Sequence, residues 1–493
     1  MASAPDFDVV IVGAGISGIN TAYRIQSNFP RYRYCILEAR DAIGGTWDLF
    51  KYPGIRSDSD LFTFGFQWYP WNRNNPIATG ESILEYLAEA SSKHGIDKNI
   101  RFKHKLQHAS WSTEYQEWTL SVTRGTKATS ISSRFVVFGT GYYDYSTPLQ
   151  AHIPGLDTFA GQVVHPQFWP STLDYTDKKV VVIGSGATAV TLVPKLAEKA
   201  KLATMLQRSP TYIVALPNRS TRSLVDYVLP RAVALRLKRL RWIVTSRLLF
   251  LFCRAFPQSA RWLFRRGTLR LLPPTMSFDP HFNPAYDPWT QRLCVCPDGD
   301  FYKALHTGRA DVVTGTIRTV TPAGIQLEAG GFLDADVIVT ATGLKMQLGG
   351  GATVDVDGRP VAPADKFMWR GAMLQDVPNA FFVMGYTNAS WTLGADATAT
   401  LAVRLLRTLG RNGGTSVVPR VRNPEALELA PLMNLNSTYV KAAAGAMPKA
   451  ATGGSLPRGG ITWPTSFAQS MGVWMAWSGF GGGRGMARHR WWV

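Results

Sequence analysis

The sequence predicts an α/β fold with two Rossmann-like dinucleotide-binding domains and a helical insertion in the second of them. Two glycine-rich turns, about 170 residues apart, each follow a run of β-branched residues and open a helical pattern. Between residues 219 and 285 the composition changes to Arg, Leu, Phe and Trp at roughly helical spacing. A chain of 493 residues, 45% of them hydrophobic, is long enough for two or three globular domains.

The first glycine-rich turn, Gly13-Ala-Gly15-Ile-Ser17-Gly18, follows the strand-like run of residues 8–12, Asp-Val-Val-Ile-Val. In this pattern the first Gly permits a tight turn, the second lets a pyrophosphate approach the backbone, and the third allows close helix packing. The phosphate then lies at the helix N-terminus, where N–H groups and the helix dipole favour an anion. Glu38 ends the next strand, where an acid accepts hydrogen bonds from a ribose diol. Because strand, helix and acid are all present, we favour a dinucleotide site over a glycine turn that binds nothing.

The second glycine-rich turn consists of Gly184, Ser185, Gly186, Ala187, Thr188 and Ala189, with Ala in place of the third Gly, as the pattern permits. The next strand ends at Gln207 and is followed by Arg208 rather than an acid. An acid would repel a 2′-phosphate, whereas a guanidinium group pairs with it. The second site is therefore predicted to prefer NADPH over NADH, although a surface arginine would give the same pattern. Two such units in one chain indicate FAD in the first and NADPH in the second.

Composition narrows the possible classes of protein. The four cysteines do not form a redox pair next to the first glycine turn, which disfavours a disulfide reductase, and Cys294-Val-Cys296 is interpreted as an inert core pair. Few cysteines and the absence of a leader-like N-terminus favour the cytoplasm. No metal site is expected.

The charge of the chain favours anionic partners. An excess of 53 Lys and Arg over 34 Asp and Glu gives a formal net charge of +19, which attracts anionic surfaces. We expect no membrane-spanning helix and no nucleic-acid partner. Basic, aromatic-rich residues 229–272 indicate either peripheral contact with an anionic membrane or, in the interpretation favoured slightly, core-packed helices whose arginines face water.

Between the two glycine turns the segment of residues 159–170 matches the signature FxGxxxHxxxWP at every defined position. The matching residues are Phe159, Gly161, His165, Trp169 and Pro170. On this segment the chain resembles the Baeyer-Villiger monooxygenases, and the resemblance extends over residues 7 to about 447. Within that family, the sequence is most similar to the ethionamide-activating branch. In that family the segment is thought to be a hinge between the two domains. The alternative is a His and a Trp that pack at a domain interface.

The resemblance also implies the site residues. It places Arg292 as the active-site arginine and Asp58 as the carboxylate that positions it next to the flavin; a structural ion pair is the alternative. A fixed cation suits this place because the reaction develops negative charge on oxygen, and arginine keeps its charge at any working pH. Further positions implied for FAD are Thr46, Trp47, Asp58 and Leu106, and a further position implied for NADP is Arg56. The sequence departs from many relatives at Gln291, where they carry Lys.

The implied enzyme uses FAD, NADPH and O2 to insert one oxygen atom into an apolar ketone, giving an ester or a lactone, and to oxygenate thioethers and thioamides. The first alternative is a flavin monooxygenase restricted to N and S atoms, against which Trp169-Pro170 and Arg292 argue. The second is a basic surface-binding protein with vestigial nucleotide sites, which would lack flavin colour. The sequence leaves the oligomeric state open.

The expected organisation assigns residues 1–145 and 331–447 to the FAD domain, 146–218 and 286–330 to the NADP domain, and 219–285 to the helical insertion. The strand-like run 336–343 is expected to return the chain to the FAD domain, and a helix is expected over 395–409. Residues 448–493, rich in Gly, Arg and Trp, are predicted to form a poorly ordered tail of the kind that an out-of-frame reading would produce.

Overall fold

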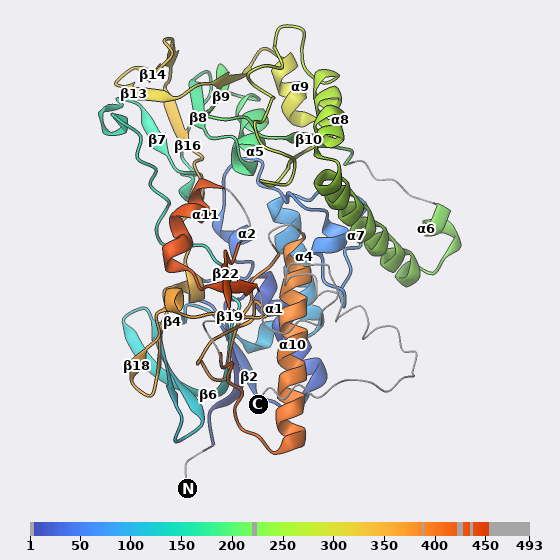
Figure 1. Ribbon diagram of the computed structural model, residues 1–493, viewed down its shortest axis with the longest axis vertical. Helices are drawn as coiled ribbons and strands as arrows, with labels where there is room; N and C mark the ends of the chain where they lie inside the picture. The colour runs from blue at the N-terminus through green and yellow to red at the C-terminus, as the bar shows by residue number, and fades with distance from the viewer. Residues whose placement is uncertain (1–3, 219–223, 387–388, 422–426, 434–436, 453–493) are drawn as a thin grey trace.

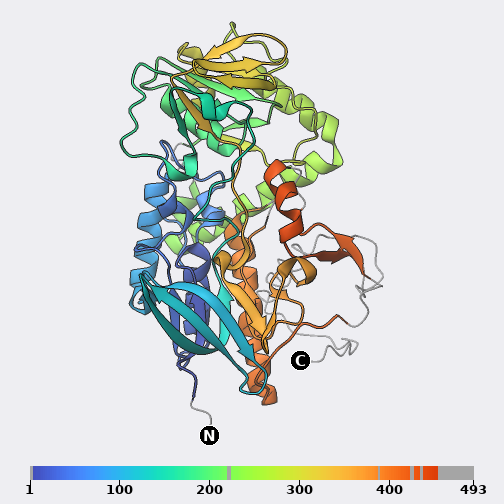
Figure 2. The same cartoon turned by 90° about the vertical axis from the view of Figure 1, so that its left-hand side faces the viewer.

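The computed structural model describes residues 4–218, 224–386, 389–421, 427–433 and 437–452. Two sheets lie one above the other along the long axis of the molecule (Figures 1 and 2), and the chain passes between them more than once. Most of the tail predicted to be poorly ordered, residues 453–493, lies outside the described residues. Ala450–Thr452 forms strand β23, which pairs with β22 (Glu428–Ala430).

Within the described residues, the first sheet has nine strands in the order β18-β17-β4-β5-β6-β1-β2-β3, with β21 paired to β6. Its parallel part contains β1 (Phe7–Val12), β2 (Tyr34–Leu37), β3 (Ile100–Arg101), β6 (Lys127–Phe138) and β21 (Ala380–Phe382). β4 (Lys105–Ser112) and β5 (Glu117–Arg124) form an antiparallel meander with β6, and β17 (Thr353–Val356) and β18 (Arg359–Pro360) extend it.

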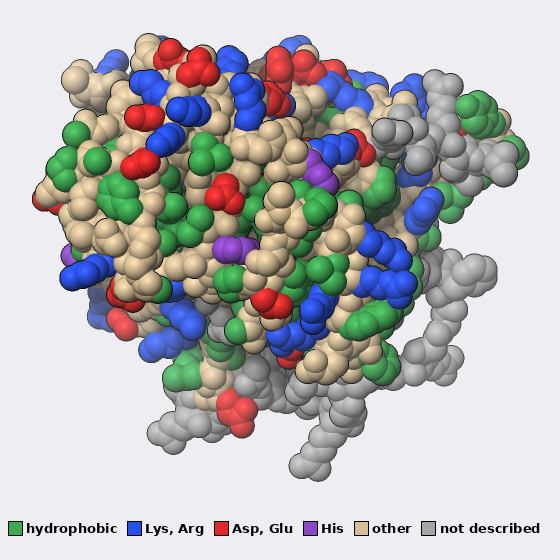
Figure 3. All heavy atoms as spheres, turned by 90° about the horizontal axis from the view of Figure 1, so that it is seen from above, with side chains coloured by type: hydrophobic (Ala, Val, Ile, Leu, Met, Phe, Trp, Pro, Cys, Tyr) green, Lys and Arg blue, Asp and Glu red, His purple; other side chains and the backbone are tan. Residues whose placement is uncertain are grey.

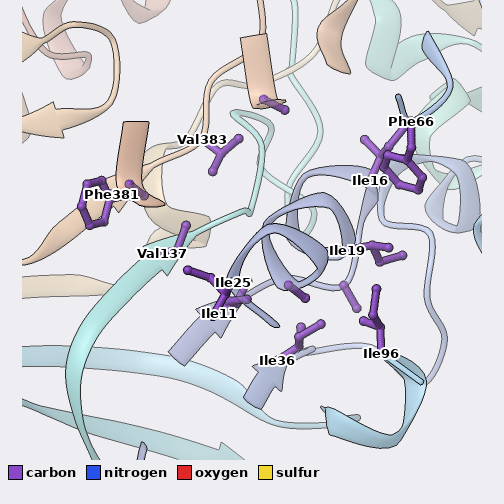
Figure 4. Packing of buried hydrophobic residues seen from close by; sticks show 14 of the residues in the cluster. Ile11, Ile16, Ile19, Ile25, Ile36, Phe66, Ile96, Val137, Phe381 and Val383 are labelled. Atoms are coloured by element: carbon purple, nitrogen blue, oxygen red, sulfur yellow. The ribbon is translucent and has the colours of Figure 1, made fainter. Parts of the chain in front are cut away.

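From Val9 to Val12, strand β1 is buried on both faces, which explains the unbroken apolar run of these four residues. Ile11 belongs to a core formed with α1 (Ile16–Asn28), α4 (Gly80–Lys93) and α10 (Trp391–Asn412), part of which Figure 4 shows. Val10 faces the opposite core, under the antiparallel meander. The helix expected over 395–409 is confirmed within α10. The glycine turn thus leaves a strand that is fixed from both sides.

The second sheet is parallel, with the order β12-β9-β8-β16-β7 in the described part of the chain. Its strands are β7 (Gln162–Val164), β8 (Lys179–Ile183), β9 (Leu202–Gln207), β12 (Ala310–Thr314) and β16 (Val337–Thr340). Helices α5 (Ala187–Leu196) and α9 (Asp300–His306) pack in the core of this half. Smaller sheets are formed by β10 (Ile213–Leu216) with β11 (Cys294–Pro297), and by β13 (Ile317–Thr321), β14 (Gly324–Leu327) and β15 (Phe332–Asp334).

The position of β16 corrects one expectation from the sequence. The sequence predicts that the first domain resumes at residue 331 and that the run 336–343 belongs to it. In the structure, β16 pairs in parallel with both β8 and β7 and so belongs to the second sheet. Its four residues are all buried, so their hydrophobic pattern does not distinguish one parallel sheet from another. The chain rejoins the first sheet only with β17.

Several short elements complete the described part of the fold. They include α2 (Thr46–Leu49), α3 (Leu61–Phe64), α11 (Thr438–Ala443), β19 (Met368–Trp369) and β20 (Met373–Leu374). In residues 219–285, the described part forms α6 (Leu224–Val228), α7 (Arg231–Ala255) and α8 (Pro257–Leu269), as expected of a helical insertion. Helix α7 projects along one side of the molecule (Figure 1). In the described residues, no helix has the length and apolarity needed to cross a membrane.

Helix α7 is fastened to the first half of the chain by Arg239. Its Nη1 donates hydrogen bonds to the backbone oxygens of Phe62, Thr63 and Gly65, at distances of 2.9, 3.0 and 2.7 Å. These carbonyls belong to the C-terminal end of α3, where a helix leaves acceptors unsatisfied and favours a cation. Burial lowers the pKa of Arg239, and the nearby carboxylates of Asp396 and Asp60 oppose that shift. The guanidinium group is therefore both a helix cap and a link between the insertion and α3.

We expect Arg239→Met to lower the free energy of unfolding by about 2–4 kcal/mol, because hydrogen bonds to a charged group are lost and three enclosed carbonyls lose their donor. The urea midpoint of tryptophan fluorescence measures this loss. Arg236→Met is the matched control, since Arg236 lies exposed on the same helix. Equal midpoints for the two variants would show that the carbonyl contacts contribute nothing.

Candidate active site

A cavity of about 530 Å³ lies where the two halves meet. Of the residues proposed for the site from the sequence, those that line it are Gly13, Gly15, Ser17, Glu38, Thr46, Trp47, Arg56, Asp58, Leu106, Ala187 and Arg292. The cavity therefore joins the first glycine turn, the start of α5 and the proposed catalytic pair in one space. Gly13, Glu38 and Ala187 converge because each follows the end of a parallel strand or lies in the loop after it. Leu106 instead lies within β4, and Arg292 precedes β11.

The first glycine turn has the geometry that a pyrophosphate needs. Gly13 has φ +100°, and a Cβ on Gly18 would lie 1.8 Å from the Gly13 oxygen, so both positions require glycine. Gly15 is the N-cap of α1 and supplies no side-chain hydrogen bond to it. The first N–H groups of α1 are thus without a side-chain cap at the edge of the cavity, which fits a bound phosphate. Ser17 accepts a hydrogen bond of 2.8 Å from Trp391 Nε1, which fixes α1 against α10.

Glu38 is buried and connects the end of β2 to the glycine turn. One carboxylate oxygen accepts from Ala14 N at 2.7 Å and the other from Arg40 N at 2.9 Å. Burial raises the pKa of Glu38, and these hydrogen bonds oppose that shift. Each oxygen keeps a second lone pair, so the group is held in place and can still accept from a ribose hydroxyl.

Around the same cavity, Thr46 Oγ1 lies 2.9 Å from Tyr145 Oη, and Trp47 packs edge-on against Phe64. Leu106 is buried in β4. Sequence reasoning missed the aromatic residues that line the cavity after β6, which are Tyr142, Tyr143 and Tyr145. The signal was the short Gly139-Thr-Gly141 turn directly after a strand, a third loop at the same sheet edge.

The second glycine turn is open toward solvent. Gly184 has φ +135°, and a Cβ there would lie 2.3 Å from the Ala341 oxygen, whereas a Cβ on Gly186 would meet no atom within 4 Å. Gly186 caps α5 without a side-chain hydrogen bond. Ser185 Oγ donates to Ser209 O at 3.1 Å. The space in front of Gly186 therefore fits the approach of a second pyrophosphate.

The two residues after this turn that were proposed for NADP differ in accessibility. Arg208 is exposed just past β9. The Gln207 side chain instead points into the core, where its Nε2 donates to His281 O at 2.7 Å and to Thr314 Oγ1 at 3.0 Å. Its direction follows from the alternation of side chains along a strand. The structure thus leaves Arg208 available to a phosphate and does not support a side-chain role for Gln207.

Arg292 and Asp58 lie together at the cavity, with Nη1 and Oδ2 3.4 Å apart. Each side chain is 37% exposed, so both groups face the open space. The negative charge of Asp58 raises the pKa of Arg292 further above its usual value. The site therefore holds a permanent, oriented cation, which can stabilise negative charge on a reacting oxygen.

Arg56 connects the two halves of the chain. It is ion-paired to Asp300 at the start of α9, and its side chain is 8% exposed. Thr188, at the start of α5, hydrogen-bonds the Tyr52 hydroxyl in the first half. Arg56 and Ala187 of the second glycine turn both line the cavity. A role in binding NADP remains a prediction.

The FxGxxxHxxxWP segment does not line the cavity and contains β7, the edge strand of the second sheet. Gly161 has no room for a Cβ, which would lie 2.3 Å from the Asp336 oxygen. His165 Nδ1 accepts from Gln167 N at 3.2 Å, and Gln167 in turn donates to Asp144 O at 2.7 Å. Burial lowers the pKa of His165. The hinge role of the segment remains a prediction.

The remaining members of that segment differ in their surroundings. Phe159 is buried in the core under β14, Trp169 packs edge-on against Tyr175, and Pro170 is exposed.

The cysteines are not placed for thiol chemistry. All four cysteines are buried and unpaired, and burial raises the pKa of both Cys294 and Cys296 to about 12, which removes their nucleophilic character at neutral pH. Within the described residues, no group of His, Cys, Asp and Glu is arranged to hold a metal ion.

Residues 10–235 match the family described as pyridine nucleotide-disulphide oxidoreductase. Over 451 residues the chain is 46% identical to the FAD-containing monooxygenase EthA of Mycolicibacterium smegmatis, and the match covers 90% of each protein. The chain belongs to the FAD-containing monooxygenases.

The fold agrees with this family. An oxidised steroid monooxygenase bound to NADP has a TM-score of 0.72 and 21% identity to this chain, with 96% of this chain and 98% of that one covered. An ε-caprolactone-bound cyclohexanone monooxygenase has a TM-score of 0.68 and 20% identity, with coverages of 85% and 91%. This FAD-containing monooxygenase therefore has the fold of the Baeyer-Villiger enzymes and is an oxidoreductase.

The two glycine turns can be tested separately. Gly18→Ala should prevent the first turn from closing, because the new Cβ would overlap the Gly13 oxygen, and the purified protein should lack flavin colour. Gly186→Ala should fold and keep its yellow colour, while the Michaelis constant for NADPH rises roughly tenfold, which corresponds to about 1.4 kcal/mol. Flavin absorbance and steady-state kinetics measure both effects. Loss of flavin from Gly186→Ala would contradict the assignment of the two turns to different cofactors.

Proposed function

We propose that the chain is an NADPH-dependent Baeyer-Villiger monooxygenase that also oxygenates sulfur. The overall conversion takes a ketone, O2, NADPH and a proton to an ester or lactone, NADP+ and water; a thioether or thioamide gives the S-oxide instead. The observation that carries the proposal is the Arg292–Asp58 pair, which lies at a cavity bordered by both glycine turns. The substrates of this class are apolar ketones and organosulfur compounds.

FAD fits the first turn, where Gly13, Gly15 and the N-terminus of α1 would hold its pyrophosphate and Glu38 its ribose. When bound, the flavin accepts hydride and supplies the electrons that activate O2. Thr46, Trp47 and Leu106 border the cavity and limit the access of water. NADPH is assigned to the second turn, with Arg208 available for its 2′-phosphate.

Within this cavity, Arg292 performs the chemistry that the protein itself contributes. Its guanidinium group stabilises negative charge that develops on the substrate oxygen when the carbonyl carbon is attacked. Asp58 accepts from Nη1 and fixes the orientation of the guanidinium plane, so no reorganisation is needed during the reaction. An enzyme that oxygenates only N and S atoms needs no such stabilisation at a carbonyl, which is why we favour ketone insertion.

We also propose a cytoplasmic enzyme that contacts the inner face of the membrane peripherally. Four unpaired, buried cysteines are typical of a reducing compartment. The net charge of +19 favours anionic surfaces.

Arg292→Ala should leave FAD bound and reducible by NADPH while ester formation falls by about 100-fold or more, the scale for removing a preorganised charge. Consumption of NADPH without product should rise correspondingly. Arg261→Ala is the control, because Arg261 is also ion-paired, to Asp287, but is not among the residues that line this cavity. Product analysis by gas chromatography measures the outcome, and ester formation at the wild-type rate would remove Arg292 from the mechanism.

Arg208→Ala should raise the Michaelis constant for NADPH much more than that for NADH, because only NADPH carries the 2′-phosphate that a guanidinium group binds. The comparison needs both cofactors with the same ketone. Equal changes for the two cofactors would show that another residue selects the phosphate.

A further inference from the structure

The outward face of helix α7 carries an apolar stripe that is exposed. Apolar side chains recur there every three or four residues, which places them on one side of the helix. They are Val233, Leu237, Leu240, Val244, Leu248 and Leu251, each at least 38% exposed. Among the described residues, none buries this stripe. The sequence interpretation that favoured core-packed helices is therefore wrong for this face.

The stripe continues onto the neighbouring elements. At the corner between α7 and α8, Phe256 is 59% exposed, and Trp262 on α8 is 60% exposed. Next to α7 on its other side, Tyr227 and Val228 in α6 are also exposed. Single exposed apolar residues are normal on a protein surface, but a continuous row along a 25-residue helix marks an interaction surface.

Arginines border the stripe on both sides. In helical projection, Arg241 lies on one side of the stripe and Arg236 and Arg254 on the other, and all three are exposed. On α8, Arg265 and Arg266 are exposed next to Trp262, with the Arg266 guanidinium 5.4 Å from the centre of its ring. Figure 3 shows hydrophobic and basic side chains next to one another on the right of the molecule, where α7 lies in Figure 1.

The opposite face of α7 is fixed to the protein. Arg239 is bonded to the end of α3, Trp242 stacks on Phe62, and Phe250 packs edge-on against Trp289. The helix therefore cannot turn its apolar stripe inward without breaking these contacts. The stripe is presented to solvent by a rigid support, not by a loose segment.

We propose that the outer face of α6, α7 and α8 docks on the surface of a membrane rich in anionic lipids. Apolar side chains on one strip of a helix, with arginines along its borders, match the boundary between acyl chains and negatively charged headgroups. A second copy of the chain is the less suitable occupant, because two such faces would bring their arginines together. The inference names the surface for the peripheral location proposed above and rests on that location.

Vesicle sedimentation of the yellow holoenzyme tests the surface. The probes are vesicles of phosphatidylcholine alone and of phosphatidylcholine mixed with phosphatidylglycerol, each at low and at high salt. We expect binding to the anionic vesicles at low salt and a sharp loss at high salt, because headgroup contacts are screened within a Debye length. Protein that stays in the supernatant with anionic vesicles at low salt overturns the proposal.

Two matched sets of substitutions locate the surface. Changing Arg236, Arg241 and Arg254 together to Gln should weaken binding on the order of 100-fold, because about one fifth of the affinity remains for each basic residue that is lost. Arg318, Arg359 and Arg411, which are exposed elsewhere in the structure, lose the same charge when changed to Gln and should retain most of the binding. Equal losses in the two sets would show attraction by net charge alone and overturn the assignment to α7.

A separate variant tests how much the apolar stripe of α7 contributes to vesicle binding. Leu240→Ser combined with Leu248→Ser should reduce binding and keep the flavin, since both side chains are exposed. If the wild type is a dimer that this variant converts to a monomer, with vesicle binding unchanged, a second copy occupies the stripe and the proposal fails. Oxygenation of a water-soluble ketone without vesicles is measured in parallel. If the wild type binds vesicles but does not oxygenate the ketone, the proposed function fails and the membrane surface stands.

Discussion

The two halves of this protein are joined by arginine side chains, and the geometry of the cavity depends on those junctions. Arg56 pairs with Asp300, Arg239 bonds the end of α3, and Arg292 pairs with Asp58. In each case a guanidinium group on one half meets an acceptor on the other. Arginine suits this task because it stays charged at any working pH and offers several donors in a fixed plane. A neutral or titratable group would let the halves separate as conditions change.

Helix α7 also holds the chain segments next to the two members of the catalytic pair. Arg239 contacts the segment that follows Asp58, and Phe250 contacts Trp289, three residues before Arg292. Trp289 has φ +69°, a conformation that a bulky side chain adopts only when its surroundings hold it there. One helix thus supports the chain next to both members of the ion pair. The distance between Asp58 and Arg292 is consequently set by packing outside the cavity as well as within it.

The sequence allowed those parts of the site to be predicted that depend on local structure. Gly13, Gly18 and Glu38 belong to a strand, turn and helix whose chemistry is fixed by their spacing, and the structure places them as expected. The proximity of Asp58 and Arg292, 234 positions apart, came from family resemblance and not from any pattern in the residues. The exposed stripe of α7 has a helical period that a buried face would share, so the sequence could not tell the two apart.

The sequence does not determine which of two parallel sheets a buried strand joins, which way a side chain at a strand end points, or what path a loop takes. The all-buried run of β16 could have joined either parallel sheet, and tertiary pairing alone decides between them. Gln207 lies at the end of β9, as the sequence predicts. Its side chain points into the core because side chains alternate between the two faces of a strand. The tyrosines after β6 reach the cavity through a loop whose path no periodicity indicates.

The burial of the cysteines has a consequence for how long such an enzyme remains active. A flavin monooxygenase that consumes NADPH without product releases hydrogen peroxide close to its own side chains. Peroxide oxidises the thiolate form of cysteine, and susceptibility follows exposure and a low pKa. Here burial raises the pKa of Cys35, Cys294 and Cys296 to about 12, and that of Cys253 also rises. Buried thiols with a raised pKa are poor targets for peroxide released in this way.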